Sequence, residues 1–409
     1  MTLAIITTHP IQYYSPWYRY MAQQAGIPLR VFYLWDFGVT EKKDEGFGQA
    51  IRWDVPLLEG YDFEFVPNVS ANPGTQHFGG IDNPSLKDRV LAANPSAVLM
   101  MAYNYKGLMK FIWQWPTRRA PLLIRGDSHR IIPQTGPKAL LRRMAIRTIF
   151  SRFSAALSVG AANRDYFLHH GFAPNRVFFS PHTVDNDRFM AAQPQAEIDA
   201  KAWKASLGIP QDNAVLLFVG KLQEKKRPLD LLAAFQRAQL PNVSLLFVGS
   251  GELEQAVRER ADGNPSVFFA PFQNQSQMPR TLAAGDLVAL PSYGSGETWG
   301  LILNEAMCLS RAVLASTHVG CVRDLVRHGE NGVVFEAGNV DSLTAALREA
   351  FADRERLRRW GLHGRQIVSR YSYQSATEGL LEALRALGVP PTAASPQDAA
   401  PSRTPARTG

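Results

Sequence analysis

Short apolar runs rich in β-branched residues alternate with helical stretches along almost the whole chain. The first half contains LAIITT, LRVFYLW, AVLMMAY, PLLI and AALSVG, and the second half repeats the rhythm with AVLLFVG, SLLFVGS, DLVALPS, AVLAS and GVVFE. Strands that are apolar along their whole length indicate parallel sheets with helices on both faces. The pattern therefore predicts an α/β fold.

The alternation of strands and helices is interrupted near residues 190 to 205, where no strand pattern occurs, and the next predicted strand begins at Ala214. The paused stretch is polar and alanine-rich, as expected of a linker. A chain of 409 residues is also long enough for two or three domains. We therefore expect two doubly wound, Rossmann-like domains over residues 1–190 and 200–368.

The end of the chain divides into a helix and a tail. The stretch YSYQSATEGLLEALRAL has helical apolar spacing, with Ser375 as the candidate cap. We expect this helix, at 371–388, to pack back on the first domain. Residues 389–409 are rich in Pro, Ala, Ser and Thr, and we expect them to be disordered because they have almost nothing to bury.

The number of cysteines and the N-terminal sequence indicate the cellular compartment in which the protein is expected. Cys308 and Cys321 are the only cysteines, which is too few for a disulfide framework and indicates a reducing environment. The start of the chain lacks a basic region before its apolar stretch, and no apolar run is long enough to span a membrane. We expect a cytoplasmic protein, either free or held peripherally on the inner face of the membrane.

Positive charge is concentrated in one region of the chain. The net charge is +8, and residues 106–164 hold twelve Lys and Arg side chains against one acid, Asp127. Such a field attracts an anionic membrane surface, phosphorylated substrates or nucleic acid, although a solvated basic surface explains the same composition. In a predicted helix over 138–153 the arginines scatter around the circumference, which weakens a membrane-anchor interpretation. No nucleic-acid-binding motif is present, so we expect no such partner.

Two stretches of the second domain are suited to an anion. In LLFVGKLQEKKRPLDLLAAF a strand ends at Gly220, Lys221 and Lys226 follow, and Pro228 occupies the expected first position of a helix. In DLVALPSYGSGETWGLILNEAM a strand and a glycine-rich loop precede a helix that starts near Gly300. The unpaired amides of Gly300, Leu301 and Ile302, at the positive end of the helix dipole, would hold a diphosphate.

Glu297 and Glu305 stand eight positions apart in the same stretch. On one ideal helix they would be about 80° and about 12 Å apart, so they cannot share one proton. We interpret Glu297 as a loop residue and Glu305 as a residue of the second helical turn, each contacting a different part of one long ligand, such as a nucleotide-sugar. The alternative is an acid favoured by the helix dipole at Glu297 and an exposed acid at Glu305.

Together these stretches resemble the retaining glycosyltransferases of family 4 (group 1), which have the GT-B fold. The resemblance covers most of the chain and includes SVGAANRDYFLHHGFAPNRVFFSPHTVDNDRF, FVGKLQEKKRP, FVGSGE, the E-x7-E element and LVRHGENGVVFEAGN. It implies two Rossmann-like domains facing across a cleft. It also implies a hexosyltransferase-like enzyme, without metal or cofactor, that moves a sugar from a nucleotide-sugar donor to a saccharide or lipid-linked acceptor in surface polysaccharide or glycolipid assembly.

The resemblance also implies roles for individual residues. Lys221 and Lys226 would neutralise the donor diphosphate, together with the amides of residues 300–302. Glu297 would contact the donor sugar and Glu305 the ribose, while the backbone around Phe272 and Gln273 would contact the base. Lysines and helix amides of this kind would stabilise the departing diphosphate. Retention of configuration would follow from a double displacement or from front-face attack, and the sequence leaves both open.

The first domain departs from the family pattern in two places. The family's Gly-Gly loop after the first strand is replaced by THPIQYYSPW, in which His9 and Gln12 are polar candidates for acceptor or donor contacts. The family often has a histidine near the reacting carbon after a middle strand, and LLIRGDSHRI offers both Asp127 and His129 there. Asp127, flanked by Arg125 and Arg130, is equally well explained as part of a structural ion pair.

Three other functions compete with this interpretation. A nucleotide-sugar epimerase of similar fold would act on the donor alone. A non-catalytic sugar-nucleotide or membrane-binding protein would have no reason to keep Glu297, Lys226 and Glu305 together. A dinucleotide-dependent oxidoreductase is poorly supported, because no GxGxxG follows a predicted strand.

Overall fold

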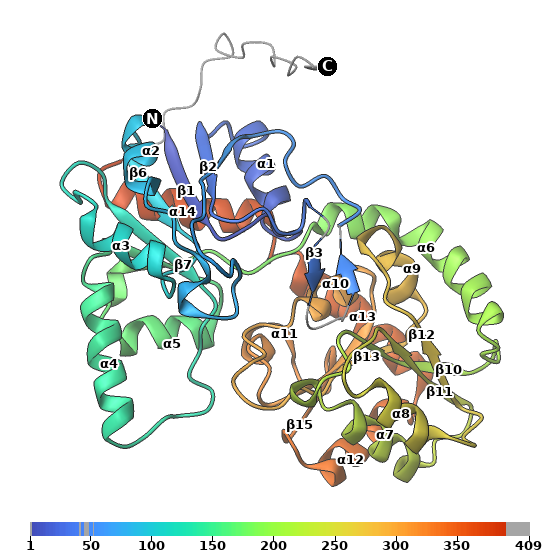
Figure 1. Cartoon of the computed structure of the whole chain (residues 1–409). Helices are drawn as coiled ribbons and strands as arrows, with labels where there is room; N and C mark the ends of the chain where they lie inside the picture. Colours follow the sequence, from blue (N-terminus) through green and yellow to red (C-terminus); the bar gives the residue numbers. More distant parts are fainter. Residues whose placement is uncertain (1, 41, 45–48, 52, 390–409) are drawn as a thin grey trace.

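The computed structural model describes residues 2–40, 42–44, 49–51 and 53–389, which form two α/β domains joined by a long helix (Figure 1). The first domain is built on a seven-stranded parallel sheet in the order β5-β2-β1-β6-β7-β8-β9. Its strands are β1 (Leu3–Thr7), β2 (Leu29–Tyr33), β5 (Asp62–Phe65), β6 (Ala97–Met100), β7 (Leu122–Gly126), β8 (Ala155–Ser158) and β9 (Val177–Phe179).

Both faces of this sheet are buried under helices. Within β1, Leu3 and Ile5 belong to one core, whereas Ala4 and Ile6 belong to the other, because successive side chains of a strand point to opposite faces. This explains why the strands are apolar along their whole length. The helices of the domain are α1 (Ser15–Gln23), α2 (Leu86–Ala92), α3 (Lys106–Gln114), α4 (Pro137–Phe150) and α5 (Ala161–His169).

The second domain is built on a six-stranded parallel sheet in the order β12-β11-β10-β13-β14-β15. Its strands are β10 (Ala214–Val219), β11 (Val243–Val248), β12 (Val267–Ala270), β13 (Leu287–Leu290), β14 (Ala312–Ser316) and β15 (Gly332–Phe335). Its helices are α7 (Pro228–Ala238), α8 (Glu254–Ala261), α9 (Met278–Ala283), α10 (Leu301–Cys308), α11 (Val322–Leu325), α12 (Val340–Phe351) and α13 (Arg354–Val368). As the sequence predicts, α7 begins at a proline, Pro228, which needs no hydrogen-bond partner at this position.

The strand orders place ligand-binding crevices at matching points of the two sheets. In each sheet the first strand, β1 or β10, lies between the second strand and a later one, β6 or β13. Open α/β sheets bind ligands at such reversals of strand order, beyond the carboxyl ends of the strands. The prediction of two doubly wound, Rossmann-like domains is confirmed.

The expected linker at 190–205 is part of a helix, α6 (Asn186–Ser206), which spans 21 residues. The side chain of Asp185 caps it by accepting a hydrogen bond from the backbone amide of Arg188. Ala196 and Ala200 pack against Ala283 and Ala284 at the end of α9. The connection between the domains is therefore a helix packed on the second domain.

The C-terminal helix α14 (Tyr373–Ala386) returns to the first domain. Leu380 and Leu384 belong to one core of the seven-stranded sheet, and the indole of Trp17 donates a 3.0 Å hydrogen bond to the hydroxyl of Thr377. The cap of α14 is Ser372, so the prediction of Ser375 was wrong. The hydroxyl of Ser372 accepts a hydrogen bond from the amide of Ser375, which already lies inside the helix.

The remaining features are local. β3 (Lys42–Asp44) and β4 (Gln49–Ile51) form an antiparallel pair. Cys308 and Cys321 are buried and unpaired. Within the described ranges, no helix has the length and apolar character needed to cross a membrane. The prediction of a disordered tail at 389–409 falls outside the described residues, apart from Val389.

Candidate active site

A cavity of about 420 Å³ lies between the two domains, beyond the carboxyl ends of strands from both sheets. Most of the residues singled out from the sequence line it: Gln12, Asp127, Lys221, Lys226, Phe272, Gln273, Glu297, Gly300, Leu301, Ile302 and Glu305. These residues come from five separate segments. The fold therefore brings them to one place because the loops after parallel strands share an edge of the sheet.

The N-terminus of α10 forms one wall of the cavity. Gly300 precedes the helix with φ +100°, and a Cβ atom there would lie 2.6 Å from the Cδ2 atom of Leu290. Glycine is therefore required by both backbone conformation and space. The amides of residues 300–302 lie at the positive end of the helix dipole, which suits the phosphate groups of a ligand.

Lys226 and Glu297 lie side by side in the cavity wall. Lys226 ends a 3-10 turn (Glu224–Lys226) after β10, and its ammonium group forms an ion pair with Oε2 of Glu297. The hydroxyl of Ser292 donates a 2.9 Å hydrogen bond to the same oxygen. Both partners of the ion pair are mostly buried, so the two side chains hold each other in fixed positions.

Glu305 lies on the second turn of α10 and is 1% exposed. Among the described residues no side chain forms a well-aligned hydrogen bond to either of its carboxylate oxygens, although Tyr13 and Gln275 lie close enough to act on the carboxyl group. Burial raises the pKa of Glu305 to about 7, although the nearby charge of Arg188 acts in the opposite direction. A buried carboxylate without a well-aligned hydrogen bond is costly, and hydroxyl groups of a ligand in the cavity could supply one. The interpretation of Glu305 as a simple exposed acid is therefore wrong.

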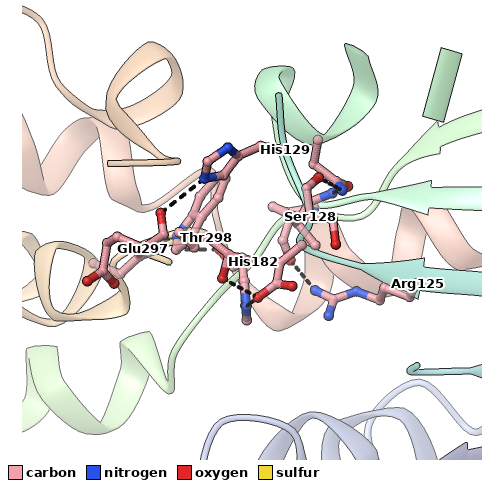
Figure 2. A network of polar contacts seen from close by, with 12 residues as sticks. Arg125, Ser128, His129, His182, Glu297 and Thr298 are labelled. Atoms are coloured by element: carbon pink, nitrogen blue, oxygen red, sulfur yellow. Dashed lines mark hydrogen bonds and ion pairs between the residues drawn. The ribbon is translucent and has the colours of Figure 1, made fainter. Parts of the chain in front are cut away.

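Two hydrogen bonds cross the domain boundary at the end of β7. The hydroxyl of Thr298 donates to Oδ2 of Asp127 at 2.7 Å, and Nε2 of His129 donates to the backbone carbonyl of Glu297 at 3.3 Å. Figure 2 shows His129 and Glu297 meeting from the two domains. Of the two candidates after β7, Asp127 lines the cavity of Glu297, whereas His129 lines a neighbouring cavity in the first domain. Burial lowers the pKa of His129, which favours its neutral form at pH 7.

Sequence reasoning missed His182, Tyr13 and Trp53, which also line the cavity. The ring of His182 stacks on Tyr14 at 5.7 Å, and its Nε2 atom lies 4.0 Å from Oδ2 of Asp127. Burial, aided by the charge of Arg125, lowers the pKa of His182 well below its usual value, so the ring is neutral. The sequence contains one indication that His182 lies at the site. His182 follows β9, the last strand of the first sheet, at the carboxyl edge where ligands bind.

His9 is the predicted site residue that the fold places away from both cavities. Its ring packs edge-on against Trp35 and Phe37, and its Nδ1 atom lies 3.0 Å from the hydroxyl of Thr8. Burial lowers the pKa of His9 to about 4. These contacts are those of a structural histidine, and Gln12 is the residue of this loop that reaches the cavity.

In the part of the chain that the structure describes, no three His, Cys, Asp or Glu side chains are grouped so that they could hold a metal ion.

Comparison with known proteins places these features in a family. Residues 199–367 match the family model described as glycosyl transferases group 1. The chain is 30% identical over 363 residues to the D-inositol 3-phosphate glycosyltransferase of Mycobacterium bovis, covering 81% of this chain and 72% of the relative. It is 32% identical to the protein of the same name from Segniliparus rotundus, where the match covers 52% of this chain and only 47% of the relative.

Solved structures share the arrangement of the two domains. The Anabaena protein HepE, in complex with UDP and glucose, has a TM-score of 0.70 and 20% identity, covering 94% of this chain and 100% of HepE. The glycosyltransferase WaaG, involved in lipopolysaccharide biosynthesis, has a TM-score of 0.63 and 16% identity, covering 92% and 99%. At this level of identity the likeness shows the GT-B fold.

Proposed function

Because this chain belongs to the group 1 glycosyltransferases, we propose that it moves a sugar from a nucleotide-sugar donor to a hydroxyl group of a saccharide or lipid-linked acceptor. The observation that carries the proposal is the cavity between the domains. The cavity is lined by Lys221, Lys226, the N-terminus of α10 and a buried carboxylate, Glu305. This combination suits a ligand with a diphosphate in its middle and hydroxyl groups at both ends.

Each part of the donor has a proposed partner. The two lysines and the amides of residues 300–302 bind the diphosphate, and Glu305 accepts hydrogen bonds from the ribose hydroxyls. Phe272 and Gln273 adjoin the base, and Glu297 contacts hydroxyl groups of the sugar. Ion pairing with Lys226 supports this role, because it holds Glu297 in place before the donor arrives.

In the proposed reaction the acceptor oxygen forms a bond to the anomeric carbon while the bond from that carbon to the diphosphate breaks, and the proton of the acceptor hydroxyl passes to an oxygen of the departing diphosphate. Negative charge then develops on the departing diphosphate, where Lys226 and the helix amides stabilise it. We propose that no metal ion is needed for this step. We further propose that Asp127 adjoins the anomeric carbon and that the product keeps the donor's configuration, as the family resemblance implies.

The exposed side chains of α4 support the proposal that the protein associates peripherally with an anionic membrane. Leu140, Leu141 and Met144 are 57%, 67% and 58% exposed, an unusual density of apolar surface on one helix. Basic side chains surround them: Lys138, Arg142, Arg143 and Arg147. Apolar residues flanked by cations suit the interface of a membrane with acidic headgroups. Such a position would also give access to a lipid-linked acceptor.

The experiment that tests the proposed function is product analysis with a panel of nucleotide-sugars. A glycosyltransferase releases the nucleoside diphosphate and forms a new glycoside only when an acceptor is present. Conversion of the donor without an acceptor would instead show an epimerase, and nucleotide binding without turnover would show a non-catalytic protein. Proton NMR of the glycoside would test retention through its anomeric coupling.

A further inference from the structure

The segment that follows β4 reaches from the first domain to the second. The carboxylate of Asp54 accepts a 3.0 Å hydrogen bond from the backbone amide of Ser276, and it accepts another from the hydroxyl of the same residue. Ser276 belongs to the short 3-10 turn Gln275–Gln277, which leads directly into α9. Figure 1 shows β3, the partner of β4, in the region where the two domains meet. Because Gln275 lines the cavity between the domains, Asp54 ties the first domain to the edge of that cavity.

Trp53, the neighbour of Asp54, lines the same cavity and is half-buried. The centroid of its ring lies 6.4 Å from that of Phe272, and the two rings are inclined at 56°. Phe272 follows β12 in the second domain and adjoins the proposed position of the base. Two aromatic side chains, one from each domain, therefore lie together at the end of the cavity that is assigned to the base.

The first domain holds the indole of Trp53 in position. Gly38, in the loop after β2, has φ +91°, and a Cβ atom there would lie 3.3 Å from Cδ1 of Trp53 and 3.0 Å from the carbonyl oxygen of Pro10. The backbone at Gly38 therefore packs closely against the indole. Because Gly38 and Pro10 follow buried strands of the first sheet, the first domain sets the position of the ring before a ligand arrives.

The side chain of Gln273 has little capacity left to recognise a base. Its Nε2 atom donates a 3.0 Å hydrogen bond to the carbonyl of Pro271, and its Oε1 atom accepts a 2.7 Å hydrogen bond from the guanidinium of Arg280. Besides backbone groups, this end of the cavity offers a base mainly the faces of aromatic rings. Stacking on such a ring stabilises any base, because every base has a π-face.

The contact between Asp54 and Ser276 suits a connection that opens and closes. Both residues are exposed to solvent. An exposed hydrogen bond contributes little to stability, because water competes for the same groups. This contact can therefore break to admit a nucleotide and re-form once the nucleotide is bound.

We propose that Trp53 stacks on the base of the bound nucleotide and that Asp54, through Ser276, holds the indole over it. The base then lies against one aromatic residue of each domain, Trp53 and Phe272. The inference rests on the proposed function, because that function supplies the nucleotide. It adds a contact from the first domain to the donor, and it directs this contact to the base and away from the diphosphate.

Intrinsic fluorescence of the full chain tests the stacking directly, with UDP, GDP and ADP as the probes. Saturation with the preferred nucleotide is expected to quench part of the tryptophan emission, because a base stacked on an indole quenches it. Trp53→Phe should lose most of this quenching and keep the dissociation constant within about threefold, since phenylalanine also stacks. Trp113→Phe is the matched control, because Trp113 is 48% exposed in the first domain and does not line the cavity. Undiminished quenching in Trp53→Phe would overturn the inference.

Titration calorimetry separates a contact with the base from a contact with the diphosphate. Trp53→Ala is expected to bind the preferred nucleotide at least about tenfold more weakly than the wild type. Its affinity for pyrophosphate, measured by competition with the nucleotide, should stay within about twofold of the wild-type value. An equal loss for both ligands would show that the indole only supports the cavity wall, and this result would also overturn the inference.

The role of Asp54 is tested by the rate at which the nucleotide dissociates, measured by stopped-flow fluorescence. Asp54→Ala is expected to raise this rate about threefold or more and to leave the association rate nearly constant, because the contact forms after binding. Glu59→Ala removes the same charge from an exposed position outside the cavity and should leave both rates unchanged. Equal dissociation rates in the two variants would refute the role of Asp54.

Failure of the proposed function gives a different result from failure of the inference. A wild type that binds none of the three nucleotides would contradict both. A wild type that binds one of them, while Trp53→Ala binds it equally well, would contradict the inference alone.

Discussion

The hydroxyl of Thr298 and the carboxylate of Asp127 form a 2.7 Å hydrogen bond that joins the two domains at the wall shared by both cavities. Thr298 immediately follows Glu297 in the second domain, and Asp127 follows the end of β7 in the first. The bond therefore fixes the first domain against the loop that carries the proposed sugar contact. Its position suggests a role in aligning donor and acceptor.

Thr298→Val keeps the shape of the side chain and removes this hydrogen bond. We expect kcat to fall about tenfold or more, since a hydrogen bond to a charged group is worth about 1.5–3 kcal/mol. The dissociation constant of the nucleotide should stay nearly constant, because Thr298 is not a proposed nucleotide ligand. Thr298→Ser, which keeps the hydroxyl, should retain most of the activity. Equal kcat values in the valine and serine variants would contradict the proposed role.

Glu297→Gln and Lys226→Ala are each expected to abolish transfer while the protein stays folded. In the proposed reaction, Glu297 contacts the sugar and Lys226 stabilises the leaving diphosphate, so losses of about 100-fold or more are expected when either charge is removed. Lys225→Ala is the matched control, because Lys225 is exposed and does not line the cavity. Steady-state kinetics, with calorimetric melting to check the fold, measures these effects. Near-normal turnover in either folded variant would refute the site assignment.

Glu305 should make the stability of the free protein depend on pH. The unfolded chain releases this proton near pH 4.5, whereas the folded protein holds it up to about pH 7. Stability contributed by the protonated form is fully present below pH 4.5 and is lost as the pH rises to 7, by about 3 kcal/mol. Denaturant titrations should show this loss in the wild type and a smaller loss in Glu305→Gln. If the free energy of unfolding depends on pH identically in the wild type and in Glu305→Gln, then Glu305 does not cause the loss of stability.

Nucleotide binding should reverse the protonation of Glu305. Ribose hydroxyl groups that donate to Glu305 favour its charged form, so binding is expected to release protons between pH 6 and 7. Calorimetry in buffers with different ionisation enthalpies measures the released protons. Glu305→Gln should bind the nucleotide more weakly and without this proton release. Proton release of unchanged size in the variant would place the titrating group elsewhere.

The exposed apolar residues of α4 should determine membrane binding. Replacing Leu140, Leu141 and Met144 together by Gln is expected to weaken binding to vesicles that contain phosphatidylglycerol, since about 1 kcal/mol or more is lost per buried side chain. Ile198→Gln is the control, because Ile198 is 66% exposed on α6. Binding of the wild type should also decrease with added salt. Co-sedimentation that is unaffected by the triple substitution would show that α4 is not the contact surface.

Much of the fold could be predicted from local sequence signals. Apolar strands indicate buried parallel sheets, Pro228 marks a helix start, and Gly300 occupies a backbone conformation that favours glycine. Lys226 and Glu297 are 71 positions apart, yet both follow strands of one sheet, so their proximity could be anticipated from the rule that parallel strands share a carboxyl edge.

Other features depend on contacts between distant segments. The burial of Glu305 requires packing of the second domain against the loop after β1, which supplies Tyr13 and Gln12 to the same cavity. His182 becomes a cavity residue only because the first domain faces the second across Trp299, whose ring lies 5.8 Å away. The burial of Glu305 and the position of His182 both depend on segments far apart in the sequence, so periodicity and spacing could not predict them.

We propose that the cavity between the domains binds a nucleotide-sugar through Lys226 and its neighbours without a metal ion. The most direct test is calorimetric titration of the wild type and Lys226→Ala with UDP, GDP, ADP and their common sugar conjugates, each in the presence of EDTA. We predict that the wild type binds one nucleotide series selectively despite EDTA and that Lys226→Ala binds it at least about tenfold more weakly. Failure of the wild type to bind any of these nucleotides, or binding only when EDTA is omitted and a divalent ion is added, would show that this cavity is not a metal-independent nucleotide-sugar site.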